Sequence, residues 1–185
     1  NTLKVAKDVP LELLGPLGCG IQTGAGAVLN TFKPAAGSSI AIFGCGSVGL
    51  SALMAAKAIG CTTIIAVDVN PVRLVLARQL GATHAFDPRN CNVVEEIHKL
   101  GGGADFSLET TAIPAVFRQA VDCLTVPGVC GLVGAAPMGT EVTFDMNSIM
   151  FGRSVVGIIE GQSVPDHFIP KLVDLYRQGS LPLEK

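Results

Sequence analysis

A glycine-rich turn and a later acid are the residues of this chain whose spacing most clearly predicts chemistry. Residues 44–49 read GCGSVG and fit the pattern G-x-G-x-x-G. The turn follows an apolar run that favours a strand, and it opens a predicted helix. Asp68 ends the next predicted strand, 19 residues after Gly49. Together these features indicate a turn that binds the pyrophosphate of a dinucleotide.

Each part of this pattern has a physical reason. Gly44 permits the tight turn from strand to helix, Gly46 lets the backbone approach a phosphate, and Gly49 lets the helix pack close to the strand. The N–H groups at the start of the helix, from Ser47 on, lack partners within the helix and face the phosphates. Asp68 is expected to accept hydrogen bonds from the adenosine ribose. The plainer alternative is a structural glycine turn with an ordinary surface aspartate, but the three contexts together favour the binding turn.

Asp68 also bears on the choice of cofactor. A ribose 2′-phosphate would lie close to its carboxylate, and like charges about 4 Å apart repel by about 4 kcal/mol at an effective dielectric constant of 20. Arg73, five residues further on, could accept a 2′-phosphate, but it can also pair with ribose oxygens. The sequence therefore predicts NAD in preference to NADP.

The elements that must position these residues alternate along the chain. Apolar runs predict strands over residues 40–43, 64–67, 84–86, 104–108, 129–133 and 155–159, with a weaker one over 142–144. Helical patterns cover residues 47–59, 71–80, 93–100, 114–124 and 166–177. This alternation predicts an α/β fold with a doubly wound, mainly parallel sheet and helices on both faces, the Rossmann fold.

Composition excludes several classes of protein. The 185 residues are 49% hydrophobic and 15% charged, which excludes a disordered chain. A formal net charge of -2 argues against a nucleic-acid or membrane-surface partner, and no apolar stretch is long enough for a transmembrane helix. The six cysteines form no C-x-x-C pair, so we expect at least five buried free thiols and a cytoplasmic protein.

The first part of the chain differs from the rest. Residues 1–36 contain no strand pattern and are expected to be a lead-in segment, whereas residues 37–185 form the predicted nucleotide-binding domain. The chain starts at Asn1 without a methionine and stops at Lys185. We therefore expect a piece of a longer protein.

A second motif lies about 25 residues upstream of the glycine turn. Residues 18–27 read GCGIQTGAGA, and in this position they resemble the zinc-dependent medium-chain alcohol dehydrogenases. The resemblance continues through residues 67–70, 80–83, 103–105 and the strand that ends at 133–134. Within the family the chain is similar to the aryl-alcohol (benzyl alcohol) dehydrogenases, on the basis of residues 15–24 and 158–161.

The resemblance implies roles for further residues. Cys19 matches a thiolate ligand of the catalytic zinc, which would be complete only in the intact enzyme. Thr23 and Val48 match residues beside the nicotinamide, and Val133 and Ala135 match backbone groups that hold its carboxamide.

Three other positions complete the comparison of site residues. Asp68 and Arg73 match contacts to the adenosine ribose. Glu160 stands where some members have an aromatic residue, which leaves the carboxamide contact from this loop open.

The resemblance also implies a function. The chain would be the NAD-binding domain of a zinc-dependent alcohol dehydrogenase that oxidises aromatic primary alcohols to aldehydes, with the catalytic domain absent and no catalytic residue in this fragment. The alternatives are a zinc-free reductase of the quinone reductase type, which has no use for the Cys19 thiolate, and a non-catalytic dinucleotide-binding module. Residues 142–144 are expected at the sheet edge, where two copies would pair into a dimer, with a tetramer as an option for the intact enzyme.

Overall fold

Parallel strands form the centre of the molecule. The computed structural model describes residues 3–5 and 9–185 of the chain, and within them six strands make one sheet in the order β3-β2-β1-β4-β5-β6. Every neighbouring pair is parallel. Because the order runs outward from β1 in both directions, the sheet is doubly wound. The predicted fold class is confirmed.

The strands are β1 (Ser39–Phe43), β2 (Thr63–Val67), β3 (His84–Phe86), β4 (Ala104–Glu109), β5 (Leu124–Leu132) and β6 (Ser154–Gly157). The α-helices are α1 (Gly20–Gly26), α2 (Ser47–Ala58), α3 (Pro71–Leu80), α4 (Val93–Gly101), α5 (Pro114–Asp122), α6 (Met146–Met150) and α7 (Pro165–Arg177). Short turns of other helical types are η1 (Leu11–Leu13), η2 (Gly15–Gly18), η3 (Ala27–Phe32) and η4 (Glu160–Gln162).

Local sequence signals set the bounds of α3. The side chain of Asn70 caps the helix by accepting a hydrogen bond of 2.9 Å from the backbone N–H of Val72. Pro71 occupies the first turn, where its missing N–H costs nothing. The helix ends at Gly81, whose φ of 124° is accessible to glycine. The prediction over residues 71–80 is therefore confirmed at both ends.

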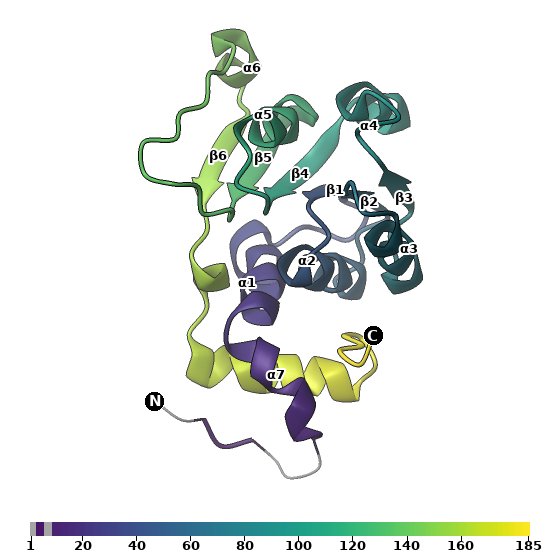
Figure 1. The fold of residues 1–185 in the computed structure, drawn as a ribbon, viewed down its shortest axis with the longest axis vertical. Helices are drawn as coiled ribbons and strands as arrows, with labels where there is room; N and C mark the ends of the chain where they lie inside the picture. Colours follow the sequence, from purple (N-terminus) through teal and green to yellow (C-terminus); the bar gives the residue numbers. More distant parts are fainter. Residues whose placement is uncertain (1–2, 6–8) are drawn as a thin grey trace.

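Successive residues of β1 alternate between two hydrophobic cores. Ile40 and Ile42 belong to the core shared with α1, α2, α3 and α7. Ala41 and Phe43 belong to the core shared with α4 and α5. Figure 1 shows these two groups of helices on opposite sides of the sheet. The strands are covered on both faces, as expected for a parallel sheet.

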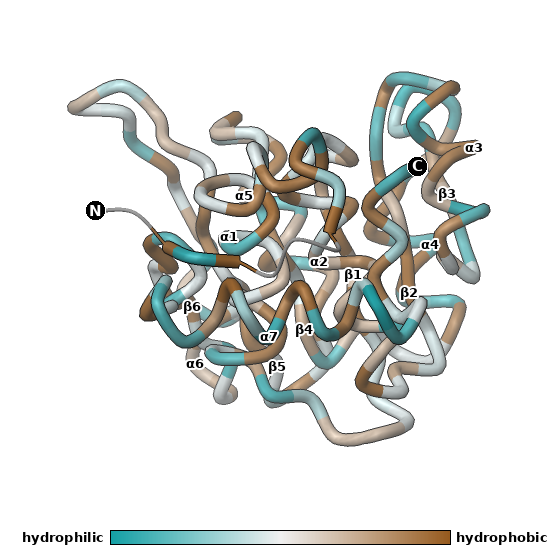
Figure 2. Tube along the Cα trace, turned by 90° about the horizontal axis from the view of Figure 1, so that it is seen from below, coloured by the Kyte–Doolittle hydropathy of each residue, from teal (hydrophilic) through white to brown (hydrophobic). Residues whose placement is uncertain are grey.

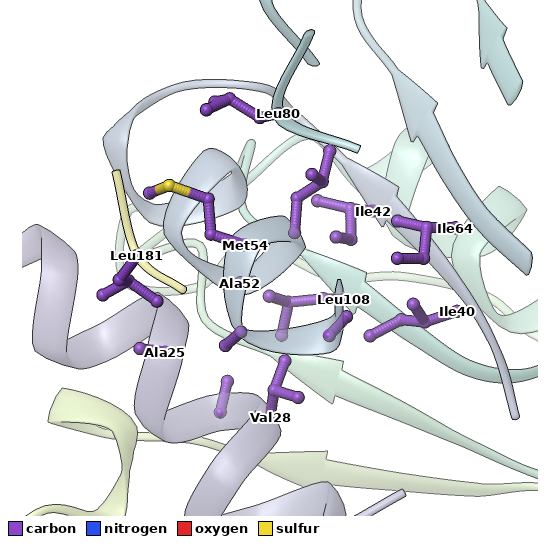
Figure 3. Close-up of a cluster of buried hydrophobic side chains, with 14 of the residues drawn as sticks. Ala25, Val28, Ile40, Ile42, Ala52, Met54, Ile64, Leu80, Leu108 and Leu181 are labelled. Atoms are coloured by element: carbon purple, nitrogen blue, oxygen red, sulfur yellow. The ribbon is translucent and has the colours of Figure 1, made fainter. Parts of the chain in front are cut away.

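The segment before β1 packs into the larger core. Figure 3 shows Ala25 and Val28 beside Ala52 of α2 and the sheet residues Ile42 and Leu108. All five side chains have no exposed surface. The region expected as a lead-in thus covers one face of the sheet.

The helices α1 and α2 approach each other closely. A Cβ on Gly24 would overlap the carbonyl oxygen of Val48 and Oγ of Ser51. Ser51 Oγ also lies 3.2 Å from the carbonyl oxygen of Gly20. Glycine at position 24 is what allows α1 to lie against the start of α2.

The strand predicted over residues 142–144 is wrong. This segment has no regular structure, and β6 occupies the position beside β5, with Val129 opposite Ser154. Residues 142–144 lie across α5 instead. Phe144 packs edge-on against Phe117 at 5.2 Å between ring centroids, and Arg118 donates a hydrogen bond of 2.8 Å to the carbonyl oxygen of Thr143.

The cysteines are less uniformly buried than expected. Cys45, Cys61, Cys123 and Cys130 are buried, but Cys91 is half-buried and Cys19 is exposed. Both lie outside the regular elements of the sheet domain, Cys91 in the connection between β3 and α4 and Cys19 just before α1. Burial raises the pKa of Cys61 to about 11 and that of Cys130 to about 12, so these thiols are poor nucleophiles.

Hydropathy follows the layers of the fold. In Figure 2 the hydrophilic stretches, coloured teal, lie mainly on peripheral turns and helices. No helix in the described part of the chain is long and apolar enough to cross a membrane.

We predict that Gly24→Ala destabilises the chain by about 1–3 kcal/mol, because the added methyl group forces α1 away from α2. Urea unfolding followed by circular dichroism measures the change. Gly18→Ala is the matched control, since a Cβ there meets nothing within 4 Å. The control should change stability by no more than about 0.5 kcal/mol. Equal urea midpoints of unfolding for the two variants would contradict the close contact between α1 and α2.

Candidate dinucleotide-binding site

The turn between β1 and α2 contains three glycines, and the steric surroundings differ at each of them. Gly44 has a φ of 94°, and a Cβ there would overlap Oγ1 of Thr110. A Cβ on Gly49 would overlap the carbonyl oxygen of Gly44. A Cβ on Gly46 would meet nothing within 4 Å, so this residue borders open space. The turn therefore leaves room for a ligand to approach its backbone at Gly46.

The first turn of α2 offers backbone donors at the same place. Gly46 is the residue before the helix, and no side chain caps the helix start. The N–H groups of Ser47, Val48 and Gly49 have no carbonyl partner four residues earlier within the helix. With the positive end of the helix dipole, they form a position suited to an anion.

Asp68 follows β2 directly and faces this turn. Its side chain is 5% exposed. Oδ2 accepts a hydrogen bond of 2.7 Å from the N–H of Cys45, and Oδ1 accepts one of 2.7 Å from the N–H of Asn70. Nη1 of Arg73 lies 3.8 Å from Oδ2. The predicted pair of Asp68 and Arg73 is thus brought together with the glycine turn.

Cys45 contributes its backbone rather than its thiol. Burial, with the nearby charge of Asp68 second, raises the pKa of the Cys45 thiol to about 12. The thiol is therefore protonated at neutral pH and is no candidate nucleophile.

A cleft of about 420 Å³ joins these groups. It is lined by six of the predicted residues, Gly44, Gly46, Ser47, Val48, Asp68 and Arg73. It is also lined by residues that the sequence did not single out, among them Val69, Thr110, Thr111 and Ile113. Val69 and Ile113 are 54% and 51% exposed, so apolar surface flanks the cleft as well as polar groups. The cleft thus combines apolar walls with backbone donors, the two kinds of surface that a planar base and a phosphate require.

The threonines come from the end of β4, which is next to β1 in the sheet. The N–H and Oγ1 of Thr110 both donate to the carbonyl oxygen of Phe43, at 3.0 and 2.9 Å. Between β1 and β4 the sheet order reverses, and open α/β sheets bind ligands at this point. The sequence signal for Thr110 was its place two residues after the strand predicted over residues 104–108.

Arg89 supports the wall of the cleft near Asp68. Its guanidinium donates to the carbonyl oxygen of Val69 at 2.6 Å and pairs with Asp87 at 2.6 Å. Hydrogen bonds from Arg89 lower the pKa of the Asp87 carboxyl. Sequence analysis did not identify this pair.

Glu109 is a buried acid at the end of β4. Its side chain has no exposed surface. Oε1 accepts hydrogen bonds from the N–H of Thr111 at 2.5 Å, from the N–H of Ala112 at 3.1 Å, and from the Thr111 hydroxyl. The carboxylate thus fixes the turn that follows β4 and borders a second cleft of about 260 Å³ with Gly134 and Ile113. An acid ending an apolar strand was the signal that could have identified it.

Val133 and Ala135, predicted as backbone contacts, lie just after β5 at the same edge. Val133 is half-buried and Ala135 is exposed. The N–H of Val133 is already used, since it donates to the carbonyl oxygen of Glu109 at 2.9 Å.

Thr23 lies on α1 and joins a polar group that the sequence did not predict. Oγ1 of Thr23 donates to Oε2 of Glu160 at 3.4 Å, and Nε2 of Gln22 donates to the same oxygen at 3.0 Å. Gln22 and Thr23 are buried, whereas Glu160 is exposed. Glu160 is separated from Gln22 by 138 positions and from Thr23 by 137. Local sequence patterns do not reveal contacts over such separations.

Cys19 immediately precedes α1 and is exposed. The residues that the structure describes contain no group of three or more His, Cys, Asp or Glu side chains that could hold a metal. A catalytic zinc needs three protein ligands and an open position. Cys19 alone does not make such a site.

Another hollow of about 860 Å³ lies elsewhere, and Lys57, Gln79, Tyr176, Gly179 and Lys185 are among the residues that border it. None of the predicted site residues lines it, so it is not the nucleotide cleft.

Comparisons with known proteins identify the family of the chain. The family model described as "Zinc-binding dehydrogenase" matches residues 47–178. A geraniol dehydrogenase from Castellaniella defragrans is 43% identical over 189 aligned residues, which cover 100% of this chain and 50% of that protein.

Solved structures show the same fold. A crystal structure of an alcohol dehydrogenase zinc-binding domain protein from Burkholderia ambifaria is 54% identical, with a TM-score of 0.96, over 98% of this chain and 50% of that one. The benzyl alcohol dehydrogenase from Acinetobacter calcoaceticus is 49% identical, with a TM-score of 0.97, over 100% of this chain and 51% of that one.

The chain spans about half the length of the relatives that it matches. The family model covers more than half of the chain, and the resemblance seen in residues 18–27 and 44–49 is confirmed. The chain belongs to the zinc-binding dehydrogenase family.

Proposed function

We propose that this chain is the NAD-binding part of a zinc-dependent alcohol dehydrogenase. The observation that carries the proposal is the position of the Asp68 carboxylate, 2.7 Å from the N–H of Cys45 within the glycine turn. An acid for the ribose and a turn for the phosphates thus border one cleft, at the place where the sheet order reverses. Membership of the family supports the same conclusion.

The chain's own residues bind and orient the cofactor. The N–H groups of Ser47 and Val48 hold the pyrophosphate beside Gly46, and Asp68 accepts hydrogen bonds from the adenosine ribose with Arg73 next to it. Bound NAD supplies the acceptor for the hydride that leaves the alcohol carbon.

The other end of the cofactor is held by a different set of residues. Backbone groups of Val133 and Ala135 hold the carboxamide, and Thr23 and Val48 lie against the nicotinamide ring. Because the N–H of Val133 already donates to Glu109, Val133 acts through its carbonyl oxygen.

Cys19 supplies one thiolate ligand of a zinc ion in the whole protein. Its exposure before α1 supports this role, because the other ligands must come from outside the described residues. The chain itself contributes no catalytic residue. A zinc-free reductase of the quinone reductase type would have no use for this thiolate, and a non-catalytic module would need neither Cys19 nor a substrate.

The substrate class we propose is a small aromatic primary alcohol, which is oxidised to the aldehyde. The similarity to a benzyl alcohol dehydrogenase supports it. The geraniol dehydrogenase among the relatives makes a terpenoid alcohol the competing substrate.

We also propose that two copies pair through β6, which replaces residues 142–144 as the edge strand on this side of the sheet. An exposed strand edge offers unpaired N–H and C=O groups. Apolar side chains exposed around it, Met146, Met150, Phe151 and Val155, add surface for a two-fold contact. A tetramer of the intact protein would use further surfaces.

We predict that the chain binds NADH more tightly than NADPH and that Asp68→Ala narrows this preference about tenfold, because a like charge next to the 2′-phosphate is removed. Fluorescence titration gives the Kd of NADH and the Kd of NADPH. The ratio of the two Kd values does not change when a variant weakens the binding of both nucleotides equally. Asp166→Ala removes an exposed carboxylate on α7 and should leave the ratio unchanged. A parent-like ratio in Asp68→Ala would exclude the ribose contact.

We predict that the purified chain does not oxidise benzyl alcohol with NAD, even when zinc is added, since a single thiolate cannot hold a catalytic zinc. Isothermal titration should show equally weak zinc binding by the parent and by Cys19→Ser. Turnover by the parent, with stoichiometric zinc binding that Cys19→Ser abolishes, would contradict the assignment of the missing ligands to another part of the protein.

We predict that Val155→Pro shifts the chain from dimer to monomer. The N–H of Ile158 donates to Leu132 of β5 at 2.9 Å, so the N–H of Val155, an odd number of residues away along the strand, points to the free edge. Proline removes that outward donor and leaves the contacts with β5 intact. Val155→Thr keeps the donor and serves as the control in sedimentation velocity. Dimers of both variants would show that β6 is not the interface.

A further inference from the structure

Three consecutive residues after β6 adopt left-handed backbone conformations. Glu160, Gly161 and Gln162 have φ values of 49°, 65° and 49°. Two of them carry side chains, for which this conformation is unfavourable. Such backbone persists only where surrounding contacts fix it, and it gathers at functional sites.

The contacts that fix this turn come from α1 and η3. Nδ2 of Asn30 donates to the carbonyl oxygen of Gly161 at 3.0 Å. A Cβ on Gly26 would lie 2.8 Å from Cα of Gly161, so the two backbones touch. Figure 1 shows the turn between β6 and α7, beside α1. The position of Glu160 is therefore set by the fold.

Only one of the two carboxylate oxygens of Glu160 contacts α1. Oε2 accepts from Nε2 of Gln22 at 3.0 Å and from Oγ1 of Thr23 at 3.4 Å. Oγ of Ser163 completes the group by donating to Oε1 of Gln22 at 3.3 Å. No hydrogen bond from the described residues reaches Oε1 of Glu160, and no lysine or arginine among them pairs with it. The negative charge is thus exposed, and no cation in the described part of the chain compensates it.

This charge lies at the edge of the sheet where the nucleotide cleft opens. Glu160 follows the carboxyl end of β6, and the glycine turn follows the carboxyl end of β1 in the same parallel sheet. Ser51 Oγ joins α1 to α2 at Gly20, two residues before Gln22. A dinucleotide with its adenosine at Asp68 and its phosphates at Gly46 extends along this edge toward β4, β5 and β6. Its second ring then lies on the same side of the turn as Glu160.

We propose that Glu160 makes the site discriminate between the two redox states of the cofactor, in favour of the oxidised form. The nicotinamide ring of NAD⁺ carries a positive charge, whereas that of NADH is neutral. A fixed carboxylate beside the ring attracts only the former. This inference rests on the proposed NAD site and adds to it a residue that sets the preference for the oxidised cofactor.

The size of the effect follows from the exposure of the group. One charge acting through partly aqueous surroundings changes an affinity by about threefold to tenfold. The contribution is screened by salt, as expected for an exposed charge. The hydrogen bonds that Glu160 accepts from Gln22 and Thr23 are the same for both forms of the cofactor. Their loss would therefore change the affinities for NAD⁺ and NADH equally.

The test is a set of titrations on the 185-residue chain and on Glu160→Gln, which keeps the size and an acceptor oxygen. NADH binding is followed by fluorescence, and NAD⁺ and ADP-ribose are measured by displacement of NADH. ADP-ribose lacks the nicotinamide ring and reports on the rest of the site. Glu96→Gln, which removes the partner of Lys99 on α4, is the control for loss of a carboxylate.

The expected result for Glu160→Gln is a Kd for NAD⁺ raised about threefold to tenfold, with the Kd of NADH and of ADP-ribose changed by less than about twofold. Added salt should weaken the preference for NAD⁺ in the parent and leave it unchanged in the variant. An unchanged NAD⁺/NADH ratio, or equal weakening of all three ligands, overturns the inference while leaving the proposed function in place. A parent chain that binds none of the three overturns both.

Discussion

The hydrogen bond between the N–H of Cys45 and Oδ2 of Asp68, 2.7 Å long, is the contact on which the nucleotide cleft depends. It joins the turn after β1 to the end of β2 and fixes the orientation of a carboxylate that is 5% exposed. An acid so deeply placed needs donors, because a buried charge without them is costly. The N–H of Asn70 provides the second. The same side chain therefore shapes the turn and faces the ligand.

Steric limits on the glycines determine how the surrounding layers approach one another. At Gly24, Gly49 and Gly161 the space for a Cβ is occupied by backbone atoms of another segment. These contacts bring α1 against α2, α2 against β1, and the turn after β6 against α1. They account for part of the glycine content, 22 residues of 185, that a parallel sheet alone would not require.

Much of the fold is encoded locally and could be predicted. Pro71 and Gly81 define α3 through their own backbone preferences, and the apolar runs indicate strands covered on both faces. Residues 142–144 had the composition of a strand, but the place beside β5 is taken by β6. In the candidate site, the glycine turn and Asp68 were predictable for the same local reason. The contact between Gln22 and Glu160 was not predictable, since 138 positions separate the two residues and only the tertiary fold brings them together.

The close contacts on both sides of α1 have a dynamic consequence. Gly24 meets α2 and Gly26 meets the turn after β6 with no room for a methyl group, and interlocked packing of this kind has few alternative arrangements. Neither sliding nor rotation of α1 against the sheet is available without unpacking it. From Gly20 onward the segment therefore moves as a rigid body with the glycine turn. Cys19 directly precedes this interlocked segment, and its φ of -140° and ψ of -91° lie outside the regular regions.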